Sequence, residues 1–192
     1  KPQEWLDSIT FGWSYVNGLK EMDNDHGRIF DLLLDSNINA VSIVFQLSYI
    51  TNADYTELNQ ETLADLKTIV DIAYEKGMYI IIAPYDYYGQ EWSSLNYRNY
   101  DSFMNIIHTS LQELAVYFKD YNERIAFSFL VEPRDYEDNG IDQEAVWILN
   151  EANQAYVQMV RATGGNNRYR NLIITTGWSK PDFVYQNLYQ VP

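Results

Sequence analysis

The chain has 192 residues, of which 46% are hydrophobic, and its 13 Lys and Arg against 27 Asp and Glu give a formal net charge of −14. This length and apolar content predict a single folded domain with a substantial core over residues 1–192. An acidic chain without a basic cluster argues against nucleic acid or an anionic membrane surface as a partner. No apolar run reaches the roughly 18 residues that a membrane span needs.

The side chains that usually hold metals are scarce. The sequence has no cysteine, which excludes disulfides and thiolate metal sites. His26 and His108 are far apart in the sequence, so we expect no dedicated metal site and no cofactor. The chain starts at Lys1 without a leader, which predicts a processed or recombinant segment.

Aromatic residues are abundant, with 17 Tyr and 5 Trp. Flat rings bury the apolar face of a pyranose, while carboxylates and amides bond its hydroxyl groups. An acidic chain rich in Tyr and Trp therefore suits a neutral polyol such as a sugar.

Short apolar runs alternate along the chain with longer helical stripes, which is typical of βαβ units. The runs predict strands at 9–13, 39–47, 78–85, 124–132 and 170–178. Helices are expected at 28–37, from Leu63 to Ala73 with Gly77 as the stop, at 103–118 and at 143–162. The "TGGNN" stretch at 163–167 follows the last helix, so we expect a C-terminal cap loop there and not a phosphate cradle.

Strands that are apolar throughout indicate a parallel sheet covered on both faces or closed into a barrel. One solution is an α/β fold of the (β/α)8 barrel type, with about five β/α units in this chain. The other is a doubly wound open sheet, although its glycine-rich first turn is absent. The residue pattern alone leaves both architectures open.

The stretch "FSFLVEPRD" at 127–135 places a single carboxylate directly behind an apolar run. Glu132 and Pro133 end the predicted strand, and Arg134 follows. One interpretation is a solvated charge at a strand end. The other is a catalytic acid at the carboxyl end of a barrel strand, where (β/α)8 enzymes carry their chemistry.

Several segments, taken in order, resemble glycoside hydrolase family 5, especially its cellulase and xyloglucanase branch. They are "FGWSYVNG" at 11–18, "ADYTELNQETLADLKTIVDIAYEKGMYIIIAPY" at 53–85, "FKDYNERIAFSFLVEPR" at 118–134 and "LNEANQAYVQMVRATGGNNRYRNLIITTGW" at 149–178. The resemblance covers nearly the whole chain. It implies a (β/α)8 barrel of which this chain holds roughly the first five strands.

The resemblance also assigns roles to individual residues. It implies that Glu132 is the general acid/base of a retaining, two-carboxylate mechanism that needs no metal or organic cofactor. The family's nucleophile follows the seventh strand, so we expect it to be absent from this chain, with Asp86 the only local residue that could replace it. The residues expected to bind substrate are Asn17, Tyr85, Asp86, Tyr87, Tyr88, Trp92, Arg134 and Trp178. Of these, Tyr85, Asp86 and Trp178 are expected to line one face together with Glu132.

The sequence departs from the family pattern at the strand ends. Val131 stands where the family has an asparagine that holds the sugar 2-hydroxyl. Tyr85 and Asp86 replace a paired histidine, and Ser42 replaces an arginine inside the second strand that supports the nucleophile. The scaffold therefore resembles the family more closely than the sugar-contacting residues do.

Three functions follow as hypotheses. The first is a secreted, cell-surface or periplasmic hydrolase of β-linked glucans such as cellulose or xyloglucan, weak or inactive as this chain alone. The second is a carbohydrate-binding homologue that has lost the reaction. The third is a partial-barrel interaction module that self-associates, or binds a second chain, through the exposed edges of its first and fifth strands.

Overall fold

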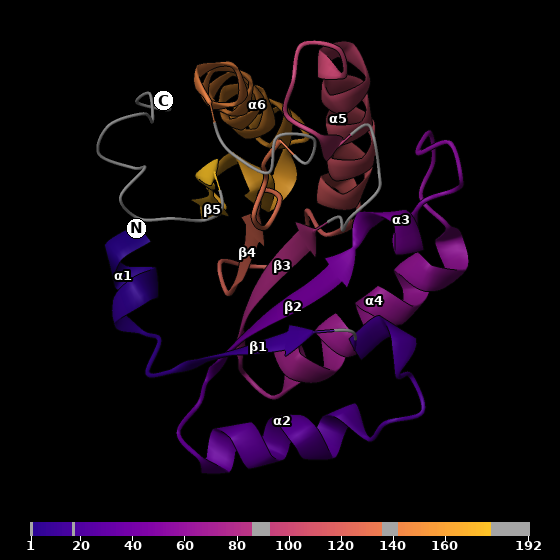
Figure 1. Ribbon diagram of the computed structural model, residues 1–192. Helices are drawn as coiled ribbons and strands as arrows, with labels where there is room; N and C mark the ends of the chain where they lie inside the picture. Colours follow the sequence, from indigo (N-terminus) through magenta and orange to yellow (C-terminus); the bar gives the residue numbers. More distant parts are fainter. Residues whose placement is uncertain (1, 17, 86–92, 136–141, 178–192) are drawn as a thin grey trace.

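The computed structural model describes residues 2–16, 18–85, 93–135 and 142–177. Its centre is one sheet of five parallel strands, drawn in Figure 1. These are β1 (Gly12–Val16), β2 (Ala40–Gln46), β3 (Tyr79–Tyr85), β4 (Ile125–Ser128) and β5 (Leu172–Ile173). The strands lie in the order of the chain. A doubly wound sheet would reverse direction at an inner strand, so this order excludes that alternative and confirms the barrel type.

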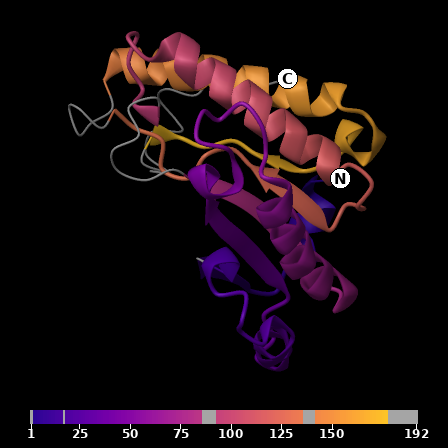
Figure 2. The same ribbon diagram turned by 90° about the vertical axis from the view of Figure 1, so that its right-hand side faces the viewer.

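Helices cover the sheet on its outer side. The longer ones are α2 (His26–Asp35), α4 (Gln60–Glu75), α5 (Tyr100–Tyr117) and α6 (Gln143–Ala162). Figures 1 and 2 show α5 and α6 side by side next to β4 and β5, whereas α2 and α4 lie beside β1 to β3. Shorter elements that the sequence did not predict are α1 (Pro2–Asp7), α3 (Leu47–Ile50) and the 3-10 turns η1 (Gly18–Lys20) and η3 (Gly165–Arg168). Within the described ranges, none of the helices combines the length and apolarity of a membrane span.

The ends of α4 show how local sequence sets the helix boundaries. The side chain of Asn59 accepts hydrogen bonds from two N–H groups of the first turn, which an N-cap residue satisfies. At the other end Gly77 has φ 83°, and its N–H donates to the Tyr74 carbonyl at 3.0 Å. The Met78 N–H donates to the Ala73 carbonyl at 3.1 Å, which completes a Schellman motif. The predicted stop at Gly77 is therefore confirmed.

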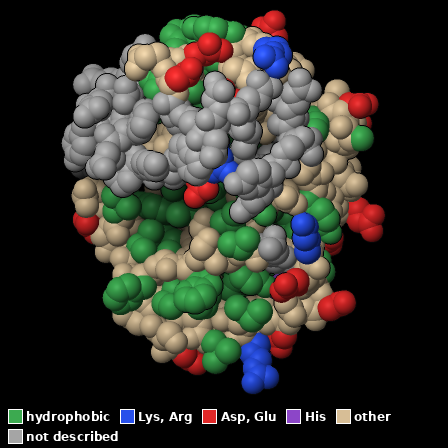
Figure 3. All heavy atoms as spheres, viewed as in Figure 1, with side chains coloured by type: hydrophobic (Ala, Val, Ile, Leu, Met, Phe, Trp, Pro, Cys, Tyr) green, Lys and Arg blue, Asp and Glu red, His purple; other side chains and the backbone are tan. Residues whose placement is uncertain are grey.

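The burial pattern of β2 separates the two faces of the sheet. Val41, Ile43 and Phe45 are buried in the core that the helices share. The alternate residues Ser42 and Val44 point to the opposite face and are only half-buried. This inner face is therefore less well covered than the helix side, and Figure 3 shows hydrophobic side chains around a recess on the face in view.

The predicted bounds of three strands were wrong, and β5 is the shortest of these, since it spans Leu172–Ile173 and not 170–178. β1 begins at Gly12 and not at residue 9, because its pairing with β2 starts where Gly12 lies opposite Ala40. β4 ends at Ser128 and not at Glu132, because only Phe127 and Ser128 pair with β5. Beyond Ser128 the chain keeps only separate backbone hydrogen bonds to its neighbours on both sides.

The sheet has two edge strands, β1 and β5. Along β1, Trp13 is 54% exposed, and the preceding Phe11 is 64% exposed. Large aromatic side chains in solvent on an edge strand are typical of a surface that another segment covers. Self-association through these edges remains a prediction.

A buried arginine organises the amino end of β4. Arg170 is 2% exposed, and its guanidinium donates to the carbonyls of Phe118, Tyr121, Asn122 and Ile125 at 2.8 to 3.1 Å. Its Nε donates to the side chain of Asn167 at 2.6 Å. Asn167 belongs to the "TGGNN" loop, where Gly164 has φ 77°, so the predicted cap loop is confirmed. This network fixes the end of α5 against the start of β4.

Candidate active site

The site lies at the carboxyl edge of the sheet, where β3 and β4 end side by side. The Val131 N–H donates to the carbonyl of Pro84 at 3.0 Å. This bond brings Glu132 next to Tyr85, the last residue of β3. The chain after β4 therefore delivers the single carboxylate of "FSFLVEPRD" to the edge where parallel β/α proteins carry their functional groups.

Glu132 has an unusual backbone conformation. Its φ is 53°, in the left-handed region that residues with a Cβ avoid at a cost of about 1–2 kcal/mol. Its side chain is nevertheless 57% exposed, so packing of the carboxylate does not explain the strain. Strained residues cluster at functional sites, where the surrounding fold holds them in place.

Arg134 forms an ion pair with the carboxylate of Glu132. Arg134 is 6% exposed, and its Nη1 lies 3.4 Å from Oε2 of Glu132. Pro133 between them is also buried. The pair therefore has one fixed partner and one accessible partner, which restricts the directions of the Glu132 side chain while leaving it open to solvent.

A second contact clamps the same segment to the chain that leads into α5. The Leu95 N–H donates to the carbonyl of Arg134 at 3.2 Å. The Ser94 hydroxyl donates to Oδ1 of Asp135 at 2.5 Å, and both residues are buried. Sequence reasoning missed this clamp, because Ser94 and Asp135 are 41 residues apart and neither belongs to a recognisable motif.

The mouth of β5 is fixed by an asparagine on α6. Asn153 is fully buried, and its Nδ2 donates to the carbonyl of Thr175 at 3.0 Å. This bond sets the course of the chain just before Trp178. The sequence offered no signal for it beyond a polar residue on an otherwise apolar helix face.

Only part of the expected site can be placed. Glu132, Arg134 and Tyr85 lie together as described above. Asn17, Asp86, Tyr87, Tyr88, Trp92 and Trp178 lie outside the described residues. Ser42 is half-buried in β2, in register with Ser14 and Ile81, and Val131 is half-buried directly before Glu132.

The two histidines occupy different environments. His26 is buried, and its Nδ1 is 2.6 Å from the Tyr15 hydroxyl. Burial lowers the pKa of His26 below its usual value, which favours the neutral ring. His108 is exposed on α5. Over the parts of the chain that the structure describes, no group of three His, Asp or Glu side chains is arranged to hold a metal ion.

The sheet has five parallel strands in chain order, with helices outside it. This arrangement defines a protein of the β/α-barrel type, and the strained Glu132 lies at the carboxyl ends of the strands, where such barrels carry their functional groups. The family model for cellulase (glycosyl hydrolase family 5) matches residues 8–190. The chain belongs to this family.

The relatives are endoglucanases. Endoglucanase B of Neocallimastix patriciarum is 28% identical over 199 residues, which cover 91% of this chain and 41% of the relative. Endoglucanase A of Paenibacillus barcinonensis is 32% identical over 143 residues, which cover 71% of this chain and 35% of the relative. The chain thus spans about two fifths or less of the length of these curated relatives.

Solved structures give the same picture. A family 5 xyloglucan-specific endo-β-1,4-glucanase from a metagenomic library, XEG5A in complex with cellotriose, superposes with a TM-score of 0.85 at 28% identity. The match covers 98% of this chain and 61% of that one. A family 5 lichenase from Caldicellulosiruptor sp. F32 superposes with a TM-score of 0.88 at 20% identity, and the match covers 58% of the lichenase chain. This likeness shows the shared fold. The five strands thus correspond to a part of the family barrel.

Proposed function

We propose that the protein acts in the hydrolysis of β-linked glucans by the retaining, two-carboxylate mechanism, with Glu132 as the general acid/base. The observation that carries the proposal is the conformation of Glu132. Its backbone is held at φ 53° at the carboxyl edge of the sheet, while its side chain stays 57% exposed. A fold that maintains strain there, with the carboxylate accessible, supports a role in chemistry.

In this mechanism Glu132 donates its proton to the glycosidic oxygen as the bond between that oxygen and the anomeric carbon breaks. A second carboxylate, about 5–5.5 Å from the first, forms the covalent glycosyl intermediate. Glu132 then removes a proton from the water that hydrolyses this intermediate. Asp135 is close to Glu132 in sequence, but Ser94 holds it in a buried hydrogen bond, so we do not assign it the nucleophile's role.

The family resemblance places the nucleophile after the seventh strand, and the residues that the structure describes contain five strands. We therefore propose that the 192-residue chain by itself is weak or inactive. General acid catalysis alone contributes about 10²–10⁴-fold, whereas enzymes commonly reach 10⁶-fold or more. The rest must come from a nucleophile and from oriented sugar contacts.

The substrate class is proposed from the relatives. Of those named above, two are endoglucanases, one is a xyloglucan-specific endo-β-1,4-glucanase solved with cellotriose, and one is a lichenase. We propose a β-1,4-linked glucan or xyloglucan as the substrate of this protein. Because such polymers lie outside cells, we also propose a secreted, cell-surface or periplasmic location.

A second candidate function is glycan binding without hydrolysis. The observation that favours it is the pair of departures at Ser42, inside β2, and at Val131, just before Glu132, because Val131 cannot bond a sugar hydroxyl and Ser42 carries no charge. Ser42 is half-buried within β2, and Val131 is half-buried in the chain that follows β4. A binder needs stacking rings and polar groups but no nucleophile.

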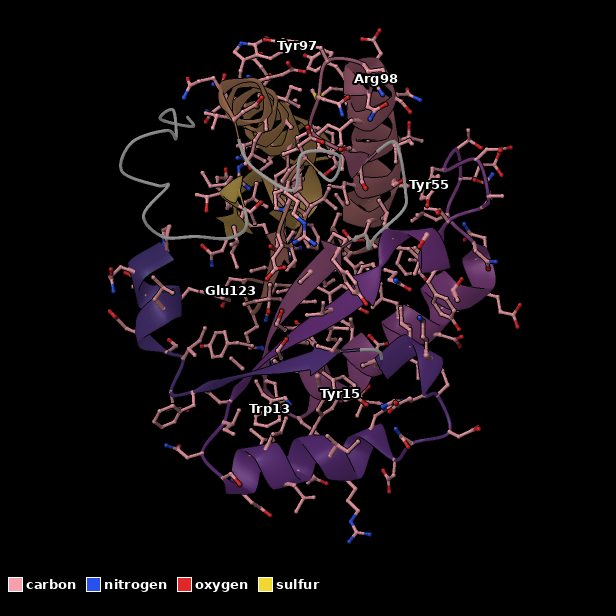
Figure 4. The ribbon with its side chains drawn as sticks, viewed as in Figure 1. Trp13, Tyr15, Tyr55, Tyr97, Arg98 and Glu123 are labelled. Carbon is pink, nitrogen blue, oxygen red and sulfur yellow. The ribbon has the colours of Figure 1, made fainter. Side chains whose placement is uncertain are left out.

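The test is an assay of the purified protein on an aryl β-cellobioside and on soluble xyloglucan. Glu132→Gln removes the acid, and Glu123→Gln is the matched control, because Glu123 is an exposed glutamate at the opposite end of the same strand. Figure 4 labels Glu123. We expect at most slow turnover that Glu132→Gln abolishes and Glu123→Gln leaves unchanged. Enzyme-like turnover that persists in Glu132→Gln would show that Glu132 is not the acid.

A further inference from the structure

Three aromatic side chains meet where α5 and α6 begin, and we call Tyr97, Tyr100 and Trp147 the aromatic platform. The ring centroids of Tyr97 and Trp147 are 5.6 Å apart, and those of Tyr100 and Trp147 are 5.4 Å apart. Interplanar angles of 57° and 35° make these tilted contacts within the usual range for aromatic pairs. The platform therefore gathers rings from α5, from α6 and from the turn that precedes α5.

Two of the three rings of the platform are open to solvent. Tyr97 is 59% exposed and Trp147 is 37% exposed, whereas Tyr100 is half-buried against the core. Figure 4 shows Tyr97 at the outer margin of the molecule, above the start of α5. A contact that served only to pack the two helices would cover these rings, so their exposure points to a ligand.

The platform is held rigidly. The Tyr97 N–H donates to the carboxylate of Glu144, in the first turn of α6. Two residues earlier, the Leu95 N–H donates to the Arg134 carbonyl at 3.2 Å. The chain that carries Tyr97 is thus tied both to α6 and to the segment that carries Glu132. Preorganised rings lose little entropy on binding.

The chemistry of the platform suits a neutral polyol. Aromatic faces bury the apolar faces of pyranose rings, and the carboxylate of Glu144, which accepts from the Tyr97 N–H, has further acceptor capacity for a sugar hydroxyl. A polyanionic ligand is disfavoured by the net charge of −14. Three rings also present far less surface than a stable protein interface requires.

We propose that the aromatic platform binds a β-linked glucan chain, in addition to the site around Glu132. This inference rests on the proposed function for its choice of glycan. We expect a long polymer to reach both regions, since Leu95, whose N–H donates to the Arg134 carbonyl, lies two residues before Tyr97, and Arg134 lies two residues after Glu132. A short substrate need not reach the platform.

The experiment measures retardation of the protein in native gels that contain soluble xyloglucan, and the affinity for cellohexaose by calorimetry. Tyr97→Ala and Trp147→Ala remove rings, whereas Tyr97→Phe keeps the stacking face. Tyr169→Ala is the control, because Tyr169 is 87% exposed and precedes β5, at the amino end of the strands. We expect each ring removal to weaken binding about three- to tenfold, as the loss of one aromatic contact implies. Tyr97→Phe and the control should bind like wild type.

Equal binding by Tyr97→Ala, Trp147→Ala and the control would overturn the proposal. If Trp147→Ala unfolds, the more exposed Tyr97 decides alone. Measuring the same variants in the Glu132→Gln background separates the two claims, because that background removes hydrolysis but leaves the platform intact. Binding that weakens when a ring is removed supports the platform, whether or not Glu132→Gln abolishes turnover. Ring-independent binding refutes the platform even if Glu132 proves to be the acid.

Discussion

Replacing Arg170 by Met should destabilise the protein strongly. Methionine fills a similar volume but leaves the four carbonyls at 2.8 to 3.1 Å, and the Asn167 side chain, without their donor. A hydrogen bond to a charged group is worth about 1.5–3 kcal/mol net, so five independent bonds of this kind would sum to about 7.5–15 kcal/mol. Burial opposes this gain, because it lowers the pKa of Arg170 to about 10.

With that cost included, the expected loss is about 3–5 kcal/mol, the range for breaking a buried charged network. For a protein of this size it should lower Tm by roughly 6–20 °C. Urea unfolding followed by circular dichroism gives the free energy of unfolding. Arg168→Met is the control, since Arg168 is exposed in the same loop and should change stability by less than about 0.5 kcal/mol. A loss below about 1 kcal/mol for Arg170→Met would refute the account of this network.

Three further predictions concern stability. A glycine variant is usually less stable than the alanine variant by about 0.5–1 kcal/mol. Because Glu132 has φ 53°, we expect the free energy of unfolding of Glu132→Gly in urea to exceed that of Glu132→Ala by about 1 kcal/mol. The opposite order, which we expect for the same pair of variants at Glu123, would contradict the strain. Because burial lowers the pKa of His26, the unfolded chain takes up a proton near pH 6.5 when the folded chain does not, so stability should fall as pH drops below that value. His26→Gln should flatten this dependence, and an unchanged pH profile would refute it. Asn59→Ala should cost about 1 kcal/mol through the lost cap of α4; a neutral result in the same assay would show that the cap is not needed.

The long helices could be predicted because each has a wide apolar stripe. The predicted helix at 143–162 coincides with α6, and the other three lie within a few residues of α2, α4 and α5. Their caps are local features, so Gly77 and the "TGGNN" loop could be read directly. The short helices α1 and α3 carry too few residues to show a period.

Strand boundaries were harder, since pairing partners decide them. β1 is exposed at most positions, so its hydrophobic pattern is weak. The prediction therefore placed this strand too early in the chain. β4 was extended to Glu132 because Phe129, Leu130 and Val131 are as apolar as the strand itself. Only the two-residue pairing with β5 shows where the strand ends.

At the candidate site, the role of Glu132 stays a prediction from the family resemblance, and its contacts could not be predicted because they depend on the fold. The strain at Glu132 is a backbone property that no residue pattern announces. The clamp between Ser94 and Asp135 and the contact between Tyr97 and Trp147 join residues about 40 to 50 positions apart. Arg170 escaped notice because its partners are mostly backbone carbonyls, which every sequence contains.

The central claim is that this chain supplies the acid/base of a family 5 glucanase. The most direct measurement uses a chimera in which the last three β/α units of the xyloglucanase XEG5A follow residue 192, assayed on an aryl β-cellobioside after circular dichroism confirms folding. We predict turnover by this chimera, loss of turnover with Glu132→Gln, and no change with Glu123→Gln. A folded chimera that is inactive, or one whose activity survives Glu132→Gln, would contradict the claim.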